Sequence, residues 1–368
     1  MRKRELKNIE WSLLIVAIIL TLIGLVALFS ATQEIEYDEF KKQIIWFVVS
    51  LVAMVIAMLI NYETLVKLSP VFYGIFIILL IAVLFTKPIN GATSWFDIKG
   101  FSLQPSEFAK IAVILFLAFT ISKIQERYID DINKPSRLLI IFAVLIVPLL
   151  LIIKQPDYGT AMSFCIAIAV MLFTSGLNKK YIIGAVIIVA VSIPVLYNFI
   201  LPEHAKKRID IFLNPESDPR GSGYNIIQSK LAIGAGQLTG MGLVKGNQTQ
   251  LGYLYPKTTD FIYSVISEEM GFIVAGIIIV LYVQLVTKAL YIAKTAKDTL
   301  GALIASGIAG IFLFHMTENI GMVMGLLPIT GVPLLFISYG GSSLITSYIL
   351  IGLLLNISSK RQKTIFVK

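Results

Sequence analysis

The stretch "MRKRELKNIEWSLLIVAIILTLIGLVALFSAT", residues 1–32, decides the fold class of this sequence. A basic start is followed by about twenty apolar residues, the length that a helix needs to cross a bilayer. The run is too long for the core of a secretory signal peptide, and no good small-x-small cleavage site follows it. We therefore interpret it as a retained first membrane span.

The composition of the whole chain indicates a membrane protein. Of the 368 residues, 57% are hydrophobic and only 14% are charged, which excludes a soluble globular domain. The formal net charge is +9, but the basic residues lie in short clusters between apolar runs, so we expect no nucleic-acid partner. The single cysteine, Cys165, excludes a disulfide framework and a cysteine metal site.

Apolar runs of about 17–25 residues predict an all-α integral membrane protein with about ten transmembrane helices. The predicted spans are 11–31, 43–60, 66–86, 106–122, 137–153, 159–176, 180–201, 260–287, 300–324 and 343–357. An even number places both termini on one side, and the basic clusters at the termini and in alternate loops make that side cytoplasmic. We expect residues 1–368 to form a single polytopic membrane domain.

One long external connection, residues 202–259, separates the seventh and eighth predicted spans. It is rich in glycine and contains the amphipathic stretch "YNIIQSKLAIGAG", which could lie on the membrane surface or re-enter the membrane. Connections of this length are usually functional or disordered. The apolar character of this one argues against disorder, so we expect a folded, functional segment.

Two polar groups lie at the external ends of predicted spans. Glu107 and Lys110 are three residues apart on one helical face, either as a first-turn glutamate with a neighbour or as a functional pair. Asp157 lies in the short external loop "KQPDYGT", where the simpler interpretation is an N-cap of the sixth helix. Both remain candidates for a site because they share one side of the membrane.

A third polar group lies inside the ninth span. His315, Glu318 and Asn319 occur at positions i, i+3 and i+4, so they share one face of a helix. Polar residues at such a depth usually face the interior of the bundle. A metal site is the weaker interpretation, because no second histidine lies nearby.

The stretch "YPKTTDFIYSVISEEMG", residues 255–271, carries three carboxylates. Asp260 could cap the eighth helix. Helical geometry places Glu268 about 80° and Glu269 about 180° around from Asp260, with Glu268 roughly 12 Å deeper, so no glycosidase-like carboxylate pair is expected. We expect the two glutamates to meet basic or amide groups of other segments.

Several of these groups gather at the external face. Glu107, Asp157, Asp260 and the 202–259 connection all lie there, and this convergence makes Asp260 more than a cap. An external cavity with carboxylates and lysines, reached through a basic loop, suits an anionic lipid substrate.

Long motifs in the right order cover nearly the whole chain. They are "GATSWFDI", "QPSEFAK", "KQPDYGT", "NPESDPRGSGYNIIQSKLAIGAGQLTGMG", "GNQTQLGYLYPKTTDFIYSVISEEMG" and "NIGMVMGLLPITGVPLLFISYGGSS". With the ten-helix layout, they resemble the SEDS family (shape, elongation, division and sporulation). The "NPESDP" and "TDFI" runs favour its rod-shape branch over its division branch. Ser94 and Glu318 depart from the family, whose members usually carry a basic and an apolar residue there.

The resemblance implies a peptidoglycan glycosyltransferase that polymerises lipid II at the outer face of the bacterial cytoplasmic membrane and releases undecaprenyl diphosphate. It implies a class B penicillin-binding protein, a transpeptidase, as partner, together with the nascent glycan strand and other proteins of cell elongation. The essential aspartate of the family falls on Asp260, and its glutamate and lysine of the fourth helix fall on Glu107 and Lys110.

The residue types at these positions are also suited to a glycosyl transfer from a diphosphate donor. A sugar hydroxyl needs a base to remove its proton, whereas a diphosphate leaving group needs charge neutralisation more than protonation. One aspartate among basic residues should therefore suffice, as in an inverting transferase. The candidates for contact with the diphosphate are Lys110, Arg208, Arg220 and Lys257. Mg²⁺ or Mn²⁺ could assist, although no ligand cluster in the sequence indicates a metal.

A lipid II flippase or other transporter is the main alternative. Glu268, Glu269 and Glu318 would then form an ion or substrate path through the membrane. Against it, the sequence has no inverted repeat, and its polar motifs crowd one face. A non-catalytic scaffold would leave the external carboxylates unexplained.

Overall fold

The computed structural model describes residues 8–88, 92–98, 101–126, 132–200 and 203–361. Each of the ten predicted spans contains a helix, so the nearly all-helical prediction is confirmed. The helices are α2 (Trp11–Ala31), α3 (Asp38–Leu59), α4 (Tyr62–Val83), α5 (Pro105–Gln125), α6 (Pro135–Lys154), α7 (Tyr158–Thr174), α8 (Lys179–Val195, followed by a π-helical turn, η3, Leu196–Ile200), α12 (Ile262–Thr295), α13 (Thr299–Val323) and α14 (Gly341–Ser359). Among the described residues, seven helices are long and apolar enough to cross a membrane: α2, α3, α4, α6, α12, α13 and α14.

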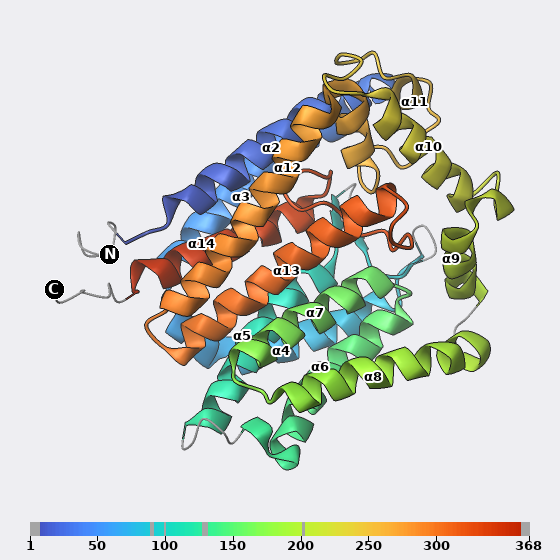
Figure 1. The fold of residues 1–368 in the computed structure, drawn as a ribbon. Helices are drawn as coiled ribbons and strands as arrows, with labels where there is room; N and C mark the ends of the chain where they lie inside the picture. The colour runs from blue at the N-terminus through green and yellow to red at the C-terminus, as the bar shows by residue number, and fades with distance from the viewer. Residues whose placement is uncertain (1–7, 89–91, 99–100, 127–131, 201–202, 362–368) are drawn as a thin grey trace.

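The helices form a bundle around α13 and α14 (Figure 1). Most residues of these two helices are buried. By contrast, α3, α4 and α6 bury few of their residues and expose apolar side chains. Exposed apolar faces on outer helices are expected where the surrounding solvent is lipid. The site described below is therefore built on the most buried part of the molecule.

The two described ends of the chain meet at one end of the bundle. Glu10, just before α2, accepts hydrogen bonds from Lys288 of α12 at 2.8 Å and from Arg361, just after α14, at 3.1 Å. Figure 1 shows both termini on that side. Residues 10 and 361 therefore lie close together at that end.

A short hairpin between α4 and α5 departs from the all-α prediction. Strand β1 (Phe96–Ile98) pairs antiparallel with β2 (Phe101–Leu103). Both strands alternate apolar and polar residues, the period of a half-buried strand. Three residues are too few for that alternation to stand out in the sequence, and for this reason the prediction missed the hairpin.

The long connection before α12 is folded, as expected. It contains α9 (Glu203–Leu213), a 3₁₀ turn, η4 (Pro215–Ser217), α10 (Ser222–Ala235) and the single turn α11 (Asn247–Gln250). In Figure 1 these elements cover the end of the bundle away from the termini. The described connection therefore forms a structured cap over that end.

Residues 237–242 of this connection insert beside a break in α12. The break is at Gly271, whose φ of 79° is left-handed. Four backbone hydrogen bonds bridge it: Met241 N to Glu268 O (2.9 Å), Gly242 N to Glu269 O (3.0 Å), Phe272 N to Gln237 O (2.8 Å) and Ile273 N to Leu238 O (3.2 Å). A broken helix is tolerated at membrane depth when other protein groups pair its freed backbone, as they do here. The predicted continuous helix is thus two segments, with residues 237–242 inserted beside the break between them.

Candidate functional site

The segment between α13 and α14, residues 324–340, is a framework for the site. The sequence suggested an uncharged external loop, but residues 334–338 are buried. Side chains of five separate positions donate hydrogen bonds to its carbonyl groups: Arg208 to Ile329 (3.3 Å), Asn319 to Val332 (2.8 Å), His315 to Pro333 (2.9 Å), Gln43 to Ser338 (3.1 Å), and Tyr282 to Leu335. Irregular backbone can be buried in a membrane protein only when its polar groups are paired in this way.

Asp260 lies against this α13–α14 loop, two residues before α12 begins. Three consecutive carbonyl groups of its segment accept hydrogen bonds from outside it. Thr258 O accepts from Tyr339 N (2.9 Å), Thr259 O from Ser338 Oγ (2.7 Å) and Asp260 O from Asn319 Nδ2 (3.0 Å). The backbone that carries the carboxylate is therefore held by α13 and by the α13–α14 loop.

The side chain of Asp260 does not cap α12. The helix begins at Ile262 with Phe261 in the capping position, and that position makes no side-chain capping hydrogen bond. The capping alternative is thus wrong, and so is the rotation estimate that treated Asp260 as part of the helix. Burial raises the pKa of Asp260 to about 6, against the opposing effects of a hydrogen bond from Thr259 and the charge of Arg208.

Glu107 and Lys110 form a buried ion pair in the first turns of α5. Lys110 Nζ lies 2.8 Å from Glu107 Oε1, and the side chains are only 3% and 2% exposed. Glu107 Oε2 also accepts a hydrogen bond from Thr346 of α14 (3.1 Å). The predicted pairing is confirmed, and the burial excludes a mere surface pair.

Lys110 also reaches His315, which links the pair to the α13–α14 loop. His315 Nδ1 lies 2.9 Å from Pro333 O, so Nδ1 carries a hydrogen in this arrangement. The other nitrogen, Nε2, lies 3.1 Å from Lys110 Nζ and accepts its hydrogen. A neutral imidazole satisfies both contacts, so the chain of contacts from Glu107 to Pro333 needs no additional charge.

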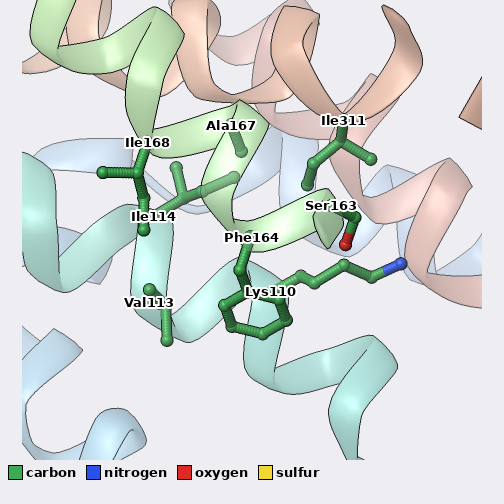
Figure 2. Close-up of a pocket in the computed structure, with 8 residues that line it drawn as sticks. All are labelled: Lys110, Val113, Ile114, Ser163, Phe164, Ala167, Ile168 and Ile311. Atoms are coloured by element: carbon green, nitrogen blue, oxygen red, sulfur yellow. The ribbon is translucent and has the colours of Figure 1, made fainter. Parts of the chain in front are cut away.

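The aliphatic part of Lys110 lines a very small pocket of about 10 Å³ (Figure 2). Ser163 is the one other polar residue in its lining. The apolar lining comes from α5, α7 and α13: Val113, Ile114, Phe164, Ala167, Ile168 and Ile311. Figure 2 shows the Lys110 ammonium group turned to one end of this lining.

Asp157 has the structural role that its simpler interpretation predicted. Its Oδ1 accepts the backbone N–H of Thr160 (3.1 Å) and caps α7. Its Oδ2 accepts a hydrogen bond from Gln104 (2.9 Å), next to the start of α5. Burial raises the pKa of Asp157, and the nearby charge of Glu107 adds to this effect. Asp157 therefore links the start of α7 to the start of α5, near the Glu107–Lys110 pair.

The basic candidates on the long connection differ in position. Arg208 of α9 is the cation whose charge acts on Asp260, and it also binds Ile329 O. Lys257 donates to Thr249 O (3.1 Å) and is thus held toward α11. Arg220 is exposed in the turn before α10. Arg208 is therefore the basic candidate that the structure couples electrostatically to Asp260.

Glu268 and Glu269 meet amide groups, as predicted. Glu268 accepts the backbone N–H groups of Gln248 (2.7 Å) and Thr249 (3.0 Å), together with the Thr249 hydroxyl (2.6 Å). Glu269 Oε1 accepts from the Gln250 side chain (2.8 Å). Both glutamates therefore anchor α11 to α12.

The ninth-helix stripe faces the interior, as predicted. His315, Glu318 and Asn319 are at most 3% exposed, and Glu318 accepts a hydrogen bond from Thr330 (2.8 Å). No three His, Cys, Asp or Glu side chains gather into a metal-binding group within the described ranges.

Sequence reasoning missed Gln43, Ser338 and Thr346. Gln43 sits in an apolar run at the start of the second span, where a buried amide is the available signal. Ser338 and Thr346 lie in and after the "SYGGSS" motif. Their hydroxyl groups give no indication of their partners until α13 and α14 are packed together.

The fold and the site define a multi-pass membrane protein with a buried polar centre beneath its large connection. A family model described as a cell cycle protein, of the FtsW, RodA and SpoVE type, matches residues 10–363. The chain therefore belongs to the FtsW/RodA/SpoVE family, the SEDS family that its motifs resemble.

Relatives of both named branches match over nearly the full chain. A "probable peptidoglycan glycosyltransferase FtsW" of Trichlorobacter lovleyi is 40% identical over 367 residues, covering 96% of this chain and 94% of the relative. The "peptidoglycan glycosyltransferase RodA" of Treponema pallidum is 32% identical over 438 residues, covering 98% and 100%. A solved structure described as "Structural coordination of polymerization and crosslinking by a peptidoglycan synthase complex" is similar, with a TM-score of 0.80, 26% identity and coverage of 95% and 97%.

Proposed function

We propose that this protein is a peptidoglycan glycosyltransferase that polymerises lipid II and releases undecaprenyl diphosphate. The observation that carries the proposal is Asp260, a partly buried carboxylate with a pKa raised to about 6, on a fixed backbone beside Arg208. A base of that pKa is mostly ionised at neutral pH and can still accept a proton. The names of the matching relatives support the same activity.

In the proposed reaction, Asp260 accepts the proton of the acceptor sugar hydroxyl. The hydroxyl oxygen attacks the anomeric carbon of the donor, and the bond from that carbon to the diphosphate oxygen breaks. The electron pair leaves with the diphosphate, whose charge Arg208 is placed to neutralise. Direct displacement with one carboxylate base inverts the anomeric centre, and it requires no second acid because the leaving group is already anionic.

Lys110 has a supporting role in this proposal. Its ammonium group is buried and already contacts Glu107 and His315, so its charge is largely committed to the protein. We assign to the Glu107–Lys110 pair the role of holding the α13–α14 loop beside Asp260. Asp157, which contacts Gln104 next to the start of α5, supports the same region. Arg220 and Lys257 are left as candidates for contact with the outer diphosphate or sugar groups.

The cellular setting belongs to the same proposal. We place the protein in the bacterial cytoplasmic membrane with ten crossings, cytoplasmic termini, a single membrane domain and the site on the outer face, acting in rod-shaped cell elongation. The partner is a class B penicillin-binding protein that binds through the external and membrane surfaces. The similar peptidoglycan synthase complex supports a crosslinking partner. Crosslinks found only on the cytoplasmic side would contradict this interface.

The transporter alternative loses its main support from sequence. Glu268, Glu269 and Glu318 accept hydrogen bonds from amide and hydroxyl groups of neighbouring loops. Groups engaged in this way do not outline a path across the bundle.

Purified protein, with and without the penicillin-binding partner, should be incubated with labelled lipid II in detergent. Glycan polymer on a gel is the expected product. Translocation of lipid II across vesicles without polymer formation would favour the transporter instead.

A further inference from the structure

The amide of Asn319 joins the segment of Asp260 to the α13–α14 loop. Asn319 is fully buried in α13. Its Nδ2 group donates one hydrogen to Asp260 O (3.0 Å) and the other to Val332 O (2.8 Å). A primary amide is suited to this position because it carries two donors on one nitrogen. One side chain thus ties two irregular backbone segments together at the position of the proposed base.

The segment of Asp260 has few internal constraints of its own. Asp260 lies outside α12, and no side chain caps that helix at Phe261. Within the segment, Phe261 N donates to Pro256 O (3.2 Å), and Thr259 donates a hydrogen bond to the carboxylate of Asp260. The backbone position of Asp260 is set mainly from outside, by α13 and the α13–α14 loop.

Ser338 supports the preceding residue in the same way. Its hydroxyl donates to Thr259 O (2.7 Å) and accepts the backbone N–H of Leu334 (2.8 Å). Ser338 is 4% exposed, so neither contact is replaced readily by water. Asn319 and Ser338 thus bind adjacent carbonyl groups.

We propose that Asn319 is a positioning residue that fixes Asp260 within reach of the acceptor hydroxyl, with Ser338 as its second support. The inference rests on the proposed role of Asp260 as the base. Asn319 acts through the backbone and touches no reacting atom, so its loss should lower turnover and leave substrate affinity nearly unchanged. A displacement of about 1 Å at a reacting group can cost about 10²-fold in rate.

Asn356 provides a matched control at the opposite end of the bundle. It is also buried, at 3% exposed. Its amide accepts from Tyr62 N (3.1 Å) and donates to Met58 O (2.6 Å). Asn356→Leu therefore removes two buried side-chain hydrogen bonds, as Asn319→Leu does, but far from Asp260.

The test uses the full-length protein with its partner and labelled lipid II. Asn319→Leu should lower kcat by about 10²-fold with KM changed by less than about threefold. Asn356→Leu, with a comparable loss of Tm, should keep kcat near that of the unmodified protein. The isosteric Asn319→Asp variant, which loses the amide donors, should behave like Asn319→Leu. Equal kcat values for the Asn319→Leu and Asn356→Leu proteins would overturn the proposal.

Ser338→Ala keeps the proposal testable if the Asn319 variants fail to fold. It removes a single hydroxyl and should lower kcat by about tenfold, since one of the two supports remains. Its control, Ser347→Ala, removes a buried hydroxyl that donates to Ser343 O within its own helix (2.6 Å) and should leave kcat unchanged. Unchanged kcat in Ser338→Ala would count against the positioning role.

The Asp260→Asn variant distinguishes a failure of Asp260 as the base from a failure of Asn319 as its positioning residue. If Asp260→Asn polymerises lipid II normally, the proposed function of Asp260 fails, and the positioning role fails with it. If Asp260→Asn is inactive while the Asn319 and Ser338 variants keep normal kcat, only the positioning role fails.

Discussion

Glu10 and Asp260 are both carboxylates placed just before a long helix, at opposite ends of the bundle, and their surroundings give them opposite character. Burial acts to raise the pKa of each. At Glu10, hydrogen bonds and charges of Lys288 and Arg361 outweigh burial, and the pKa falls below its ordinary value. At Asp260 a single hydrogen bond and the charge of Arg208 do not, and the pKa rises to about 6.

Depending on its surroundings, the same chemical group is either a structural ion-pair partner or a base. A carboxylate with two cationic partners in contact holds its charge firmly and is a poor proton acceptor. A carboxylate with weaker support keeps a pKa close to the pH at which it works. Deeper burial at Asp260 and closer cationic partners at Glu10 together separate these two sites.

The largest expected effect comes from removing the charge of Asp260, and Glu10 is its control. Asp260→Asn should lower the rate of lipid II polymerisation by about 10²- to 10⁴-fold, the usual worth of a positioned base. Glu10→Gln should polymerise lipid II at nearly the normal rate. Both proteins should reach the membrane and bind the partner, as checked by co-purification. Near-normal glycan synthesis by the Asp260→Asn protein would show that Asp260 is not the base.

A third carboxylate, Glu107, extends the comparison to full burial. Glu107→Ala or Lys110→Ala leaves the other charge uncompensated, which should destabilise the fold by about 3–5 kcal/mol. The exposed pair Lys42–Asp38 on α3 is a control, because water reaches both groups, and Lys42→Ala should leave Tm unchanged. Thermal unfolding in detergent measures both, and the charge-swapped double variant should recover part of the loss. Normal stability and polymerisation in both alanine variants would mean that the pair has no supporting role.

The dependence of kcat on pH tests whether Asp260 is the group that titrates. Because Asp260 must be ionised to act as a base, kcat should fall about tenfold per pH unit below about pH 6 and reach a plateau above it. Arg208 lowers the pKa of Asp260, so Arg208→Gln should move the acid limb to higher pH. Initial rates between pH 4.5 and 8 would measure both. An acid limb that ignores Arg208 would show that another group titrates.

The smallest effect is expected at Glu10. Its pKa is lowered in the folded protein, so its stabilisation is present above the pKa of the unfolded carboxyl and is lost as pH falls through the folded value. Glu10→Gln should therefore cost at most about 1 kcal/mol at pH 7, because water screens the contact, and nothing in strongly acidic solution. Melting curves at pH 7 and pH 3 would compare the two proteins. A constant difference in Tm across this range would contradict the assignment.

The helices could be predicted from the sequence because a membrane span requires an apolar run of a characteristic length. It also identified Asp260, Glu107 and Lys110, though chiefly through motif resemblance. The start of α12 was misplaced, since Asp260 precedes an apolar run directly and resembles a cap. The break at Gly271 was missed because one glycine inside such a run is common in membrane helices.

The α13–α14 loop could not be predicted for a different reason. Its sequence is uncharged and apolar, and from such a sequence alone we predict a short loop on the outer surface. Its buried course depends on donors from distant positions, including Gln43, His315 and Asn319. Pairing of this kind becomes visible only once the helices are packed, so the support of Asp260 was beyond sequence reasoning.

The bridge across the break at Gly271 has a consequence for building chimeras between relatives. At Gly240, a side chain would place its Cβ 2.1 Å from Glu269 O, so the backbones of the inserted segment and of the broken helix are in direct contact. Neither piece can be exchanged alone without losing shared backbone partners. Residues 236–273 should therefore be transplanted as one cassette, and crossover points belong outside it.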